Sequence, residues 1–277
     1  MAYKCFEVSI EDGVAHIVMN RPEKRNAMIA EFWTELPDIV QDIDENAKAR
    51  VIVLSSTGPV FCAGIDIGML QQDVGVSDDK NHPQHGANFY PNVKRLQASL
   101  SSLETCRIPV LAAIQGGCYG GGVDLVTACD MRYGTEDSFI TIYEINVGMT
   151  ADVGTFPRIL NHMPEGVVRE LAYTGRKMNA QECKAHGLYN EVFVNHEAML
   201  QSVMETAREI ASKPPLAVYG CKRIITYARD HSTVDTLDNI GVWNMSMLIP
   251  SEIMEAMVSA KQKRPGKFED LPKIKGV

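Results

Sequence analysis

Three carboxyl side chains lie in parts of the sequence where a charged group needs a reason. Asp124 ends the glycine-rich run 116–124, while Glu144 and Asp152 lie in the mostly apolar stretch 142–152. A buried carboxylate without a partner is strongly destabilising or takes up a proton. Acids grouped in this way beside exposed backbone amides indicate proton-transfer chemistry. The sequence therefore favours an enzyme over a scaffold.

Two turns could supply N–H groups that stabilise a negative charge. Gly120, Gly121 and Gly122 stand where a strand passes into a helix, and the segment 61–66 also follows a strand and is rich in small residues. Backbone N–H groups can approach a ligand closely there. The run lacks the lysine of a Walker loop and the spacing of a dinucleotide fingerprint. Two N–H groups from separate loops can hold a thioester oxygen, whereas a triple glycine alone also fits close helix packing.

Each acid also has a structural interpretation. Asp124 could be a helix-associated carboxylate satisfied by backbone, Glu144 a surface acid at a strand end, and Asp152 the N-cap of a following helix. For a catalytic role, each pKa must move toward the working pH, which burial can do. The neighbours expected to provide that burial are Ile142, Ile145, Val147 and Met149.

Composition disfavours several classes of function. The chain has 277 residues, 45% of them hydrophobic, and a formal net charge of -8. This balance disfavours a general role on nucleic acid or on anionic membranes, because polyanions need a clustered positive surface. The basic stretch 261–267 could bind a small phosphorylated ligand or be a solvated tail. Seven cysteines without CxxC spacing are expected to be reduced thiols.

Targeting and metal signals are weak. No apolar run approaches the ~20 residues of a membrane span, and the N-terminus has neither a secretory nor a transit character. The last three residues also differ from a Ser-Lys-Leu address, so we expect a cytoplasmic protein. The pair His82 and His85 is an unpromising metal site, because a proline interrupts the helix that would align the two rings. We expect no metal.

The spacing of apolar residues predicts an α/β core. Alternation around a turn at Gly13 predicts a hairpin. Strands, glycine-bounded loops and helices then recur, and the continuous apolar strands indicate a sheet covered on both faces. The predicted elements are a hairpin at 6–18, helices at 27–45, 87–105 and from Gly121, strands at 51–54, 110–114, 130–133 and 138–142, and loops at 58–68 and 71–86.

After residue 195 the pattern becomes almost continuously helical, with helices expected at 196–212, 215–229, 233–248 and 251–262. We therefore divide the chain into a core, 1–195, and a helical C-terminal region, 196–277. The third of these helices is rich in apolar residues, so a subunit interface explains it as well as packing within the chain does. Those residues are Leu237, Ile240, Val242, Trp243, Met245, Met247 and Leu248.

Three segments together resemble the signature segments of the crotonase (enoyl-CoA hydratase/isomerase) superfamily. They are residues 20–27, 61–66 and 116–130, and the similarity extends to Lys263, Arg264 and Pro265 near the C-terminus. The resemblance implies a crotonase-like spiral of ββα turns. It also implies a helical C-terminal trimerisation region, so that the protein would be a homotrimer or a hexamer that binds an acyl-CoA thioester.

Within that family the acids resemble one branch in particular. Hydratases of the family typically carry Glu at the position of Asp124, Glu at that of Glu144, and a Gly-Gly pair where Ala151 and Asp152 stand. This chain instead is similar to the branch that isomerises 3,5-dienoyl-CoA to 2,4-dienoyl-CoA in fatty-acid β-oxidation, with Asp, Glu and Asp at the three positions. The implied reaction moves two double bonds with a proton shuttle between two carboxyl groups, and no cofactor besides the CoA of the substrate.

The resemblance also implies roles for individual residues. Glu144 would serve carbon 2 and Asp152 carbon 6, or the reverse, with Asp124 supporting the pair. The backbone N–H groups of Ile65 and Gly121 would form an oxyanion hole for the thioester oxygen. The residues implied to contact CoA are Lys24, Arg25, Ala63 and Lys263.

Four other functions stay open at this stage. An enoyl-CoA hydratase is the nearest, although Asp124 and Asp152 count against it, and an isomerase of simple 3-enoyl-CoA is another. A non-catalytic acyl-CoA-binding protein could keep the same fold. RNA binding is the weakest alternative, because the chain is acidic and lacks an interleaved basic and aromatic surface.

Overall fold

The computed structural model describes residues 3–66, 68–69 and 83–274. It begins with the predicted hairpin, in which β1 (Phe6–Glu11) pairs antiparallel with β2 (Val14–Met19). The two turn residues between these strands, Asp12 and Gly13, have φ of 51° and 75°. Positive φ at both positions is what a two-residue hairpin turn requires, because its twist then matches that of the strands.

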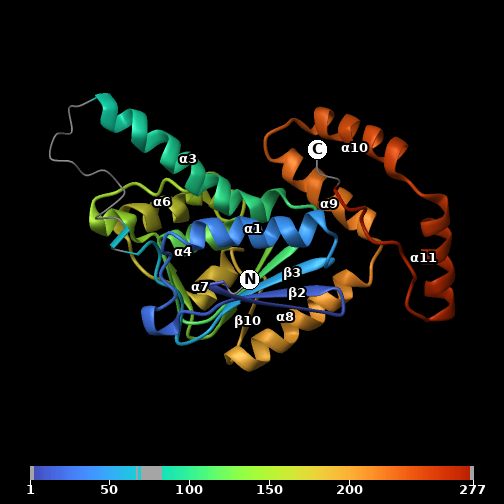
Figure 1. Cartoon of the computed structure of the whole chain (residues 1–277), viewed down its shortest axis with the longest axis horizontal. Helices are drawn as coiled ribbons and strands as arrows, with labels where there is room; N and C mark the ends of the chain where they lie inside the picture. The colour runs from blue at the N-terminus through green and yellow to red at the C-terminus, as the bar shows by residue number, and fades with distance from the viewer. Residues whose placement is uncertain (1–2, 67, 70–82, 275–277) are drawn as a thin grey trace.

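The larger sheet has six strands in the order β1-β2-β3-β5-β7-β10, and from β2 onward neighbouring strands run parallel. Its central strands β3 (Val51–Ser56) and β5 (Val110–Ile114) are buried throughout. Helices α1 (Phe32–Glu45) and α8 (His196–Ala211) lie on opposite sides of this sheet (Figure 1). The prediction that the apolar strands are covered on both faces is confirmed, and the bounds of β5 agree with the sequence pattern.

A smaller, four-stranded sheet pairs a short strand with each turn of the chain. Its order is β4-β6-β8-β9, with β4 (Val60–Cys62), β6 (Gly117–Tyr119), β8 (Phe139–Thr141) and β9 (Met178–Asn179). Three times along the chain, a strand of the larger sheet is followed by a strand of the smaller sheet. The pairs are β3 and β4, β5 and β6, and β7 (Met131–Thr135) and β8. This repeat is the spiral of strand, strand and helix that the family resemblance implies.

Helices fill the connections between the strands. They are α1 (Phe32–Glu45), α3 (Pro83–Thr105), α4 (Gly121–Thr127), α5 (Thr155–Ile159), α6 (Glu165–Thr174) and α7 (Ala180–Ala185), with 3-10 turns η1 (Pro22–Lys24) and η2 (Tyr143–Val147), and β10 is Glu191–Phe193. The helix predicted from 27 begins only at Phe32, because Met28 forms a β-bridge with Ile65. Helix α3 begins at Pro83, before the predicted start at residue 87, so the end of the predicted loop 71–86 is helical. The rest of that loop lies outside the described residues.

Up to residue 274, the C-terminal region has four helices, and they differ in how they meet the core. These are α8 (His196–Ala211), α9 (Pro215–Ala228), α10 (Thr233–Met247) and α11 (Pro250–Gln262). Met199, Val203 and Ala207 of α8 are fully buried against the large sheet, so this first helix of the region packs on the core. In contrast, α10 and α11 extend away from the sheets (Figure 1).

A buried lysine ties α9 to the core. Lys222 Nζ donates to Leu103 O at 2.8 Å and to Ile108 O at 2.9 Å, and it lies 2.9 Å from a carboxylate oxygen of Asp130. These partners satisfy a cation that would otherwise be strongly destabilising inside the protein. The connection holds the first part of the C-terminal region in place, from which α10 and α11 then leave.

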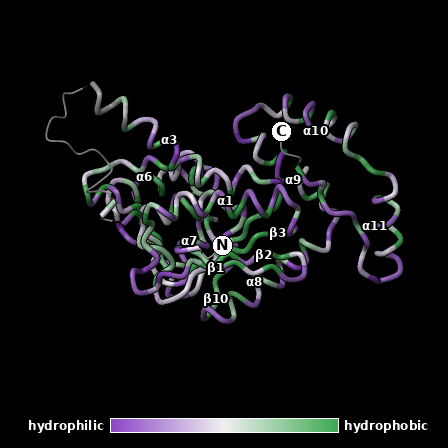
Figure 2. The backbone as a smooth tube through the Cα atoms, in the orientation of Figure 1, coloured by the Kyte–Doolittle hydropathy of each residue, from purple (hydrophilic) through white to green (hydrophobic). Residues whose placement is uncertain are grey.

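The surface of α10 and α11 remains rich in apolar side chains. Of the apolar residues noted in the sequence, Trp243 packs against Tyr219 with ring centroids 5.1 Å apart, whereas Met245 is 81% exposed and Leu237 63% exposed. Figure 2 shows hydrophobic colour along the strands β2 and β3 and, interspersed with hydrophilic colour, along both of these helices. Among the described residues, no helix combines the length and apolar character needed to cross a bilayer.

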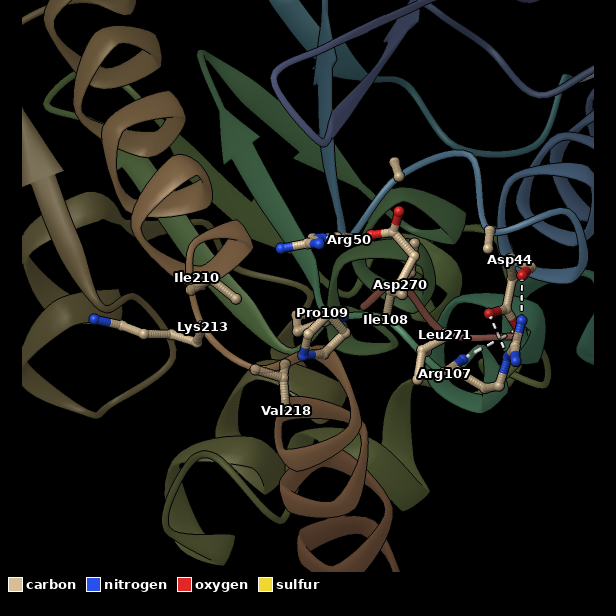
Figure 3. Close-up of a pocket in the computed structure, with 13 residues that line it drawn as sticks. Asp44, Arg50, Arg107, Ile108, Pro109, Ile210, Lys213, Val218, Asp270 and Leu271 are labelled. Carbon is tan, nitrogen blue, oxygen red and sulfur yellow. Dashed lines mark hydrogen bonds and ion pairs between the residues drawn. The ribbon is translucent and has the colours of Figure 1, made fainter. Parts of the chain in front are cut away.

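The last described residues return to the core and close it. Arg50 pairs with Asp270 at 2.6 Å, and Arg107 pairs with Asp44 at 2.9 Å and donates to Pro272 O. Figure 3 shows these side chains around a narrow hollow of only about 10 Å³. That volume holds about one water molecule, so this place seals the core and is too small for a substrate.

The cysteines form no disulfide bonds in the described part of the structure. All seven cysteines are free thiols in the structure, and six of them are buried. Within the part of the chain that the structure describes, no group of three or more His, Cys, Asp or Glu side chains is placed to hold a metal ion. His82 lies outside the described residues, as does the side chain of His85, so the interpretation of that pair stays a prediction.

Candidate active site

Two turns from separate parts of the chain meet through their glycines. A Cβ on Gly64 would lie 2.9 Å from Tyr119 O and 3.4 Å from the nitrogen of Gly121, and a Cβ on Gly121 would lie 3.5 Å from the nitrogen of Ile65. Gly64 also has φ of +85°, which other residues rarely adopt. The backbone nitrogens of Ile65 and Gly121 therefore lie close together, and only glycines leave room for the approach.

The two N–H groups are free for a ligand. On either side of Ile65, the Met28 N–H donates to Gly64 O and the Asp66 N–H donates to Met28 O, both at 2.9 Å. Gly121 begins α4, where an N–H has no acceptor one turn earlier in the helix. Neither Ile65 N–H nor Gly121 N–H has a backbone acceptor among the described residues. Two such donors side by side can stabilise an oxyanion.

Glu144 reaches this pair of turns from η2. Its Oε1 lies 3.0 Å from where a Cβ on Gly120 would stand, and its Oε2 is buried without a hydrogen-bond partner among the described residues. Burial, together with the nearby charge of Asp124, raises the pKa of Glu144 to about 7. Because the carboxyl group turns inward against the glycine turn, the interpretation of Glu144 as a surface acid is wrong.

The source of that burial differs from the sequence prediction. Ile145 is 45% exposed and Val147 is 55% exposed, so neither covers the carboxyl group of Glu144. The η2 turn points these neighbours outward while it points Glu144 inward. Ile142, by contrast, is buried in the core, and Met149 lines a cavity described below.

Asp124 is the most buried of the three acids. It is 1% exposed, and its Oδ1 accepts a hydrogen bond of 2.6 Å from the backbone N–H of Thr155. Burial raises the pKa of Asp124 to about 6, although this hydrogen bond opposes the rise. The prediction of a backbone-satisfied carboxylate is confirmed, and the bond ties α4 to the start of α5. Asp152 is not the N-cap of α5, because Gly154 occupies that position.

Asp152 lies half-buried in the segment between η2 and α5, and burial raises its pKa. Its charge would raise the pKa of both Glu144 and Asp124, which places all three carboxyl groups within electrostatic reach of one another. The backbone oxygen of Asp152 accepts a hydrogen bond of 2.7 Å from Gln97 Nε2 on α3. The structure therefore brings the three predicted acids together.

An apolar cavity of about 340 Å³, the acyl cavity from here on, joins the two parts of the site. Ile65 and Asp152 both line it, and between them its wall includes Trp33 of α1, Leu96 of α3 and Met149. Sites for small molecules are typically clefts of this size with mostly apolar walls and few polar groups. A chain bound by its carbonyl at Ile65 would extend along apolar side chains toward a carboxyl group.

The predicted CoA contacts are only partly brought together. The Ala63 N–H donates to Arg25 O at 3.0 Å, and Lys24 ends η1 directly before Arg25, so these three residues form one edge near the glycine turns. Lys263 is the C-cap of α11, and that helix lies on the opposite side of the molecule from the dark blue η1 turn (Figure 1). Within one chain, Lys263 is therefore far from the other three.

Two contributors to the site were missed by the sequence argument. Thr155 offers the N–H that Asp124 accepts, and Gln97 holds the backbone of Asp152. The start of a helix at Thr155 was a usable signal, because its free N–H groups need an acceptor. For Gln97 no signal existed, since a polar residue in an amphipathic helix is ordinary.

With this geometry in view, comparison with known proteins is informative. The sequence model of the family described as enoyl-CoA hydratase/isomerase matches residues 9–270. The chain belongs to the enoyl-CoA hydratase/isomerase family. The match covers every element that builds the site, from the η1 turn to α5, so the segments that carry the glycine turns and the acids lie within the matched region.

Relatives and solved structures agree with this assignment. The mitochondrial Delta(3,5)-Delta(2,4)-dienoyl-CoA isomerase of Rattus norvegicus is 39% identical over 276 residues, covering 98% of this chain and 84% of the rat protein. The peroxisomal enzyme of that name from Arabidopsis thaliana is 36% identical, covering 98% of this chain and 99% of the plant protein. The crystal structure of enoyl-CoA hydratase from Bacillus anthracis superposes with a TM-score of 0.83 at 27% identity, covering 98% and 100%. The predicted crotonase-like fold is confirmed.

Proposed function

We propose that this member of the enoyl-CoA hydratase/isomerase family converts 3,5-dienoyl-CoA to 2,4-dienoyl-CoA. The observation that carries the proposal is the second acid: Asp152 lines the same acyl cavity as Ile65, whereas Glu144 lies against the Gly120 turn. A shift of two double bonds needs one proton removed near the thioester and another added farther along the chain. Relatives at 36% to 39% identity that carry this activity in their names support the proposal.

The first half of the reaction belongs to Glu144 and the glycine turns. The N–H groups of Ile65 and Gly121 bind the thioester oxygen, and Glu144 removes a proton from carbon 2. Because Glu144 Oε1 lies against the Gly120 turn, it is next to the place where that carbonyl would be held. Negative charge then develops on the oxygen, where each N–H donor typically contributes about 3 to 4 kcal/mol of transition-state stabilisation.

The second half belongs to Asp152, supported by Asp124. Asp152 donates a proton to carbon 6 and the trienolate collapses to the product, with no cofactor needed beyond the CoA of the substrate. A proton donor must be protonated at working pH, and the burial that raises the pKa of Asp152 favours that state. Asp124 holds the start of α5 through Thr155, which fixes the segment that carries Asp152.

Two other functions are weighed against this one. A hydratase would use a pair of glutamates, and it has no use for a third acid in the wall of the acyl cavity. A non-catalytic acyl-CoA-binding protein would have no need for Glu144 to keep a buried oxygen without a partner, which is destabilising. Catalysis therefore explains the three acids better than acyl-CoA binding alone does.

Assembly and compartment form part of the proposal. We propose a homotrimer or hexamer formed through α10 and α11, because Leu237 and Met245 there are exposed and apolar. In such an assembly Lys263 of one copy could reach the CoA edge of another. The cytoplasmic location stays a prediction against which the names of the relatives weigh, since they are mitochondrial or peroxisomal. Fractionation of cells that express the tagged chain decides it.

An absorbance assay tests the function. Purified protein is given 3,5-octadienoyl-CoA and, in parallel, a 2-enoyl-CoA, and the native chain is compared with Asp152→Asn. We expect native isomerisation of the diene, and a loss of about 10²- to 10⁴-fold in the variant, which is the usual contribution of a general acid. Asp38→Asn, an exposed aspartate on α1, is the matched control and should keep full activity.

Water addition to the 2-enoyl-CoA as the main activity, unchanged in Asp152→Asn, would make this chain a hydratase. Silence on both substrates, with binding of acyl-CoA retained, would favour the binding protein.

A further inference from the structure

A second cavity, polar in character, lies on the other side of Asp152. It has a volume of about 350 Å³, and Asp152 is the residue that its lining shares with the acyl cavity. Gln97, which holds the backbone of Asp152, also lines it. We call it the polar cavity. Asp152 thus forms part of the wall between an apolar space suited to an acyl chain and a polar space.

The polar cavity is built from charged side chains that are held in place. Arg158 donates to Ser101 Oγ at 2.9 Å and pairs with Glu104 at 3.1 Å, and Arg229 pairs with the other oxygen of Glu104. A Cβ on Gly154 would lie 1.9 Å from a nitrogen of Arg158, so the guanidinium packs against the backbone beside Asp152. Such a fixed polar lining can hold ordered water.

The cavity also opens to solvent. Asn161 and Asp230 line it and are both exposed, so water can enter from the surface. On the other face of Asp152, the acyl cavity is lined by side chains such as Trp33 and Leu96 and would be filled by the substrate or product. An apolar, occupied cavity is a poor route for water. During turnover, the polar cavity is therefore the hydrated side of Asp152.

The proposed reaction leaves a protonation difference that must be restored. The C–H bond at carbon 2 breaks and its proton goes to the Glu144 carboxylate. The O–H bond of Asp152 breaks and its proton forms the new C–H bond at carbon 6. After each turnover Glu144 is protonated and Asp152 is ionised, so Asp152 must gain a proton and Glu144 must lose one.

We propose that the polar cavity is the route by which Asp152 regains its proton from water, so that the hydrogen added at carbon 6 comes from solvent rather than from carbon 2. This inference rests on the proposed function. Water in the cavity donates a proton to Asp152, and the hydroxide that remains is neutralised by the proton that Glu144 releases to solvent once the product has left. The alternative is direct return from Glu144 to Asp152 through the acyl cavity.

Deuterium labelling distinguishes the two routes. Unlabelled 3,5-octadienoyl-CoA is converted in deuterium oxide by a catalytic amount of native protein, and the product is analysed at low conversion by NMR. The solvent route places a single deuterium at carbon 6 in nearly every product molecule over many turnovers. Direct return would leave protium there after the first turnover, and that result would overturn the proposal.

A variant that narrows the polar cavity tests the route itself. Thr226 of α9 lines the polar cavity and not the acyl cavity, so Thr226→Phe would fill the former and leave the substrate side unchanged. We expect kcat and KM to fall together by at least about tenfold, with kcat/KM unchanged, because proton return after the chemistry becomes limiting. Ile225→Phe, on the neighbouring residue that is 65% exposed, is the matched control and should keep native kcat.

Each outcome has one meaning. Full deuterium incorporation with native kcat in Thr226→Phe would show that water reaches Asp152 by another path, and the polar cavity would lose its proposed role. A fall of kcat in both Thr226→Phe and Ile225→Phe would attribute the effect to α9 packing and also overturn the proposal. Failure of the proposed function looks different, because the native protein would then not isomerise the diene at all.

Discussion

The region around the glycine turns buries carboxyl groups, whereas the arm formed by α10 and α11 exposes apolar side chains. Both depart from the usual arrangement, in which charged groups face water and apolar groups face the core. Around the turns, the carboxyl groups of Asp124 and Glu144 are withdrawn from water, and their pKa values rise to about 6 and about 7. On the arm, Met245 and Met257 are 81% and 65% exposed although both are apolar. Each arrangement is unfavourable for an isolated chain in water.

The two regions differ in what would compensate each unfavourable arrangement. A buried acid in a cavity is explained by a reaction, since its raised pKa suits proton transfer. An exposed apolar helix face is explained by another surface, since covering it would remove apolar area from water. In the proposed function and assembly, a substrate completes the first region and another copy of the chain completes the second, so changes in the two regions should have separable effects.

The largest expected effect tests whether burial of Glu144 serves the reaction. Glu144→Gln keeps the size of the side chain but removes the base, so diene isomerisation should fall by about 10²- to 10⁴-fold. Steady-state kinetics measure it. The control is Glu197→Gln, an exposed glutamate on α8, which should retain native activity. Native activity in Glu144→Gln would contradict the catalytic explanation for the burial of this acid.

The next effect is on stability and concerns Asp124. Its pKa is about 6 in the folded protein against an ordinary 3.8, so its contribution to stability is complete below pH 3.8 and is lost as pH rises to about 6. Asp124→Asn removes that dependence while still accepting from Thr155. Relative to the variant, the native protein should lose roughly 2 kcal/mol of unfolding free energy between pH 4 and pH 7. Denaturant unfolding at both pH values measures the difference.

Asp124→Ala is the companion variant for this prediction. It lacks the acceptor for the Thr155 N–H, so it should be less stable than Asp124→Asn by about 1 to 2 kcal/mol at every pH. A native protein whose stability followed that of Asp124→Asn at both pH values would show that this acid is not destabilised by burial.

A smaller effect should come from the glycine turn. Gly120 has φ of 48°, and a Cβ there would lie 3.0 Å from Glu144 Oε1. Gly120→Ala should lower kcat by about tenfold, because the base is displaced, and should cost about 1 kcal/mol of stability from strain. Gly13→Ala is matched for strain: its φ is +75°, yet its nearest contact is an ordinary 3.6 Å. Equal kcat in the two variants would show that Gly120 serves the backbone alone.

The smallest effect on the folded chain is expected in the arm. Met245→Lys should change the unfolding free energy of the chain by no more than about 0.5 kcal/mol, since the side chain is exposed, yet it should shift the assembly toward smaller species. Sedimentation velocity measures the change. Ser251→Lys, an exposed position on α11, adds the same charge without removing an apolar group. An unchanged assembly in Met245→Lys would remove this helix face from the interface.

Much of the fold could be predicted because it depends on local patterns. The continuous apolar runs at β3 and β5 predicted a sheet covered on both faces, and the turn at Gly13 predicted the hairpin. The family signature segments predicted the spiral of turns. The division at 195 stays a prediction, because a change to helical periodicity does not tell which helices pack on the sheet. The start of α1 was misplaced for a similar reason, since Met28 pairs with a distant residue.

The site was predictable in its residue types and less so in its environment. Glycines and acids could be recognised, and their grouping was correct. The cause of burial was not, because η2 turns Ile145 and Val147 outward while it turns Glu144 toward Gly120. Lys263 was expected beside Lys24 from resemblance alone, yet within one chain α11 carries it away.

By itself, the sequence determined which groups can do chemistry and which segments can form strands, helices and tight turns. These follow from residue type and from periodicity, which act over a few neighbouring residues. Only the tertiary structure decided that Asp124 accepts from Thr155, that Ile65 and Gly121 bring their N–H groups together, and that Asp152 lies between an apolar and a polar cavity. Those facts depend on contacts between distant segments, and solvation and pKa follow from such contacts rather than from neighbours in the chain.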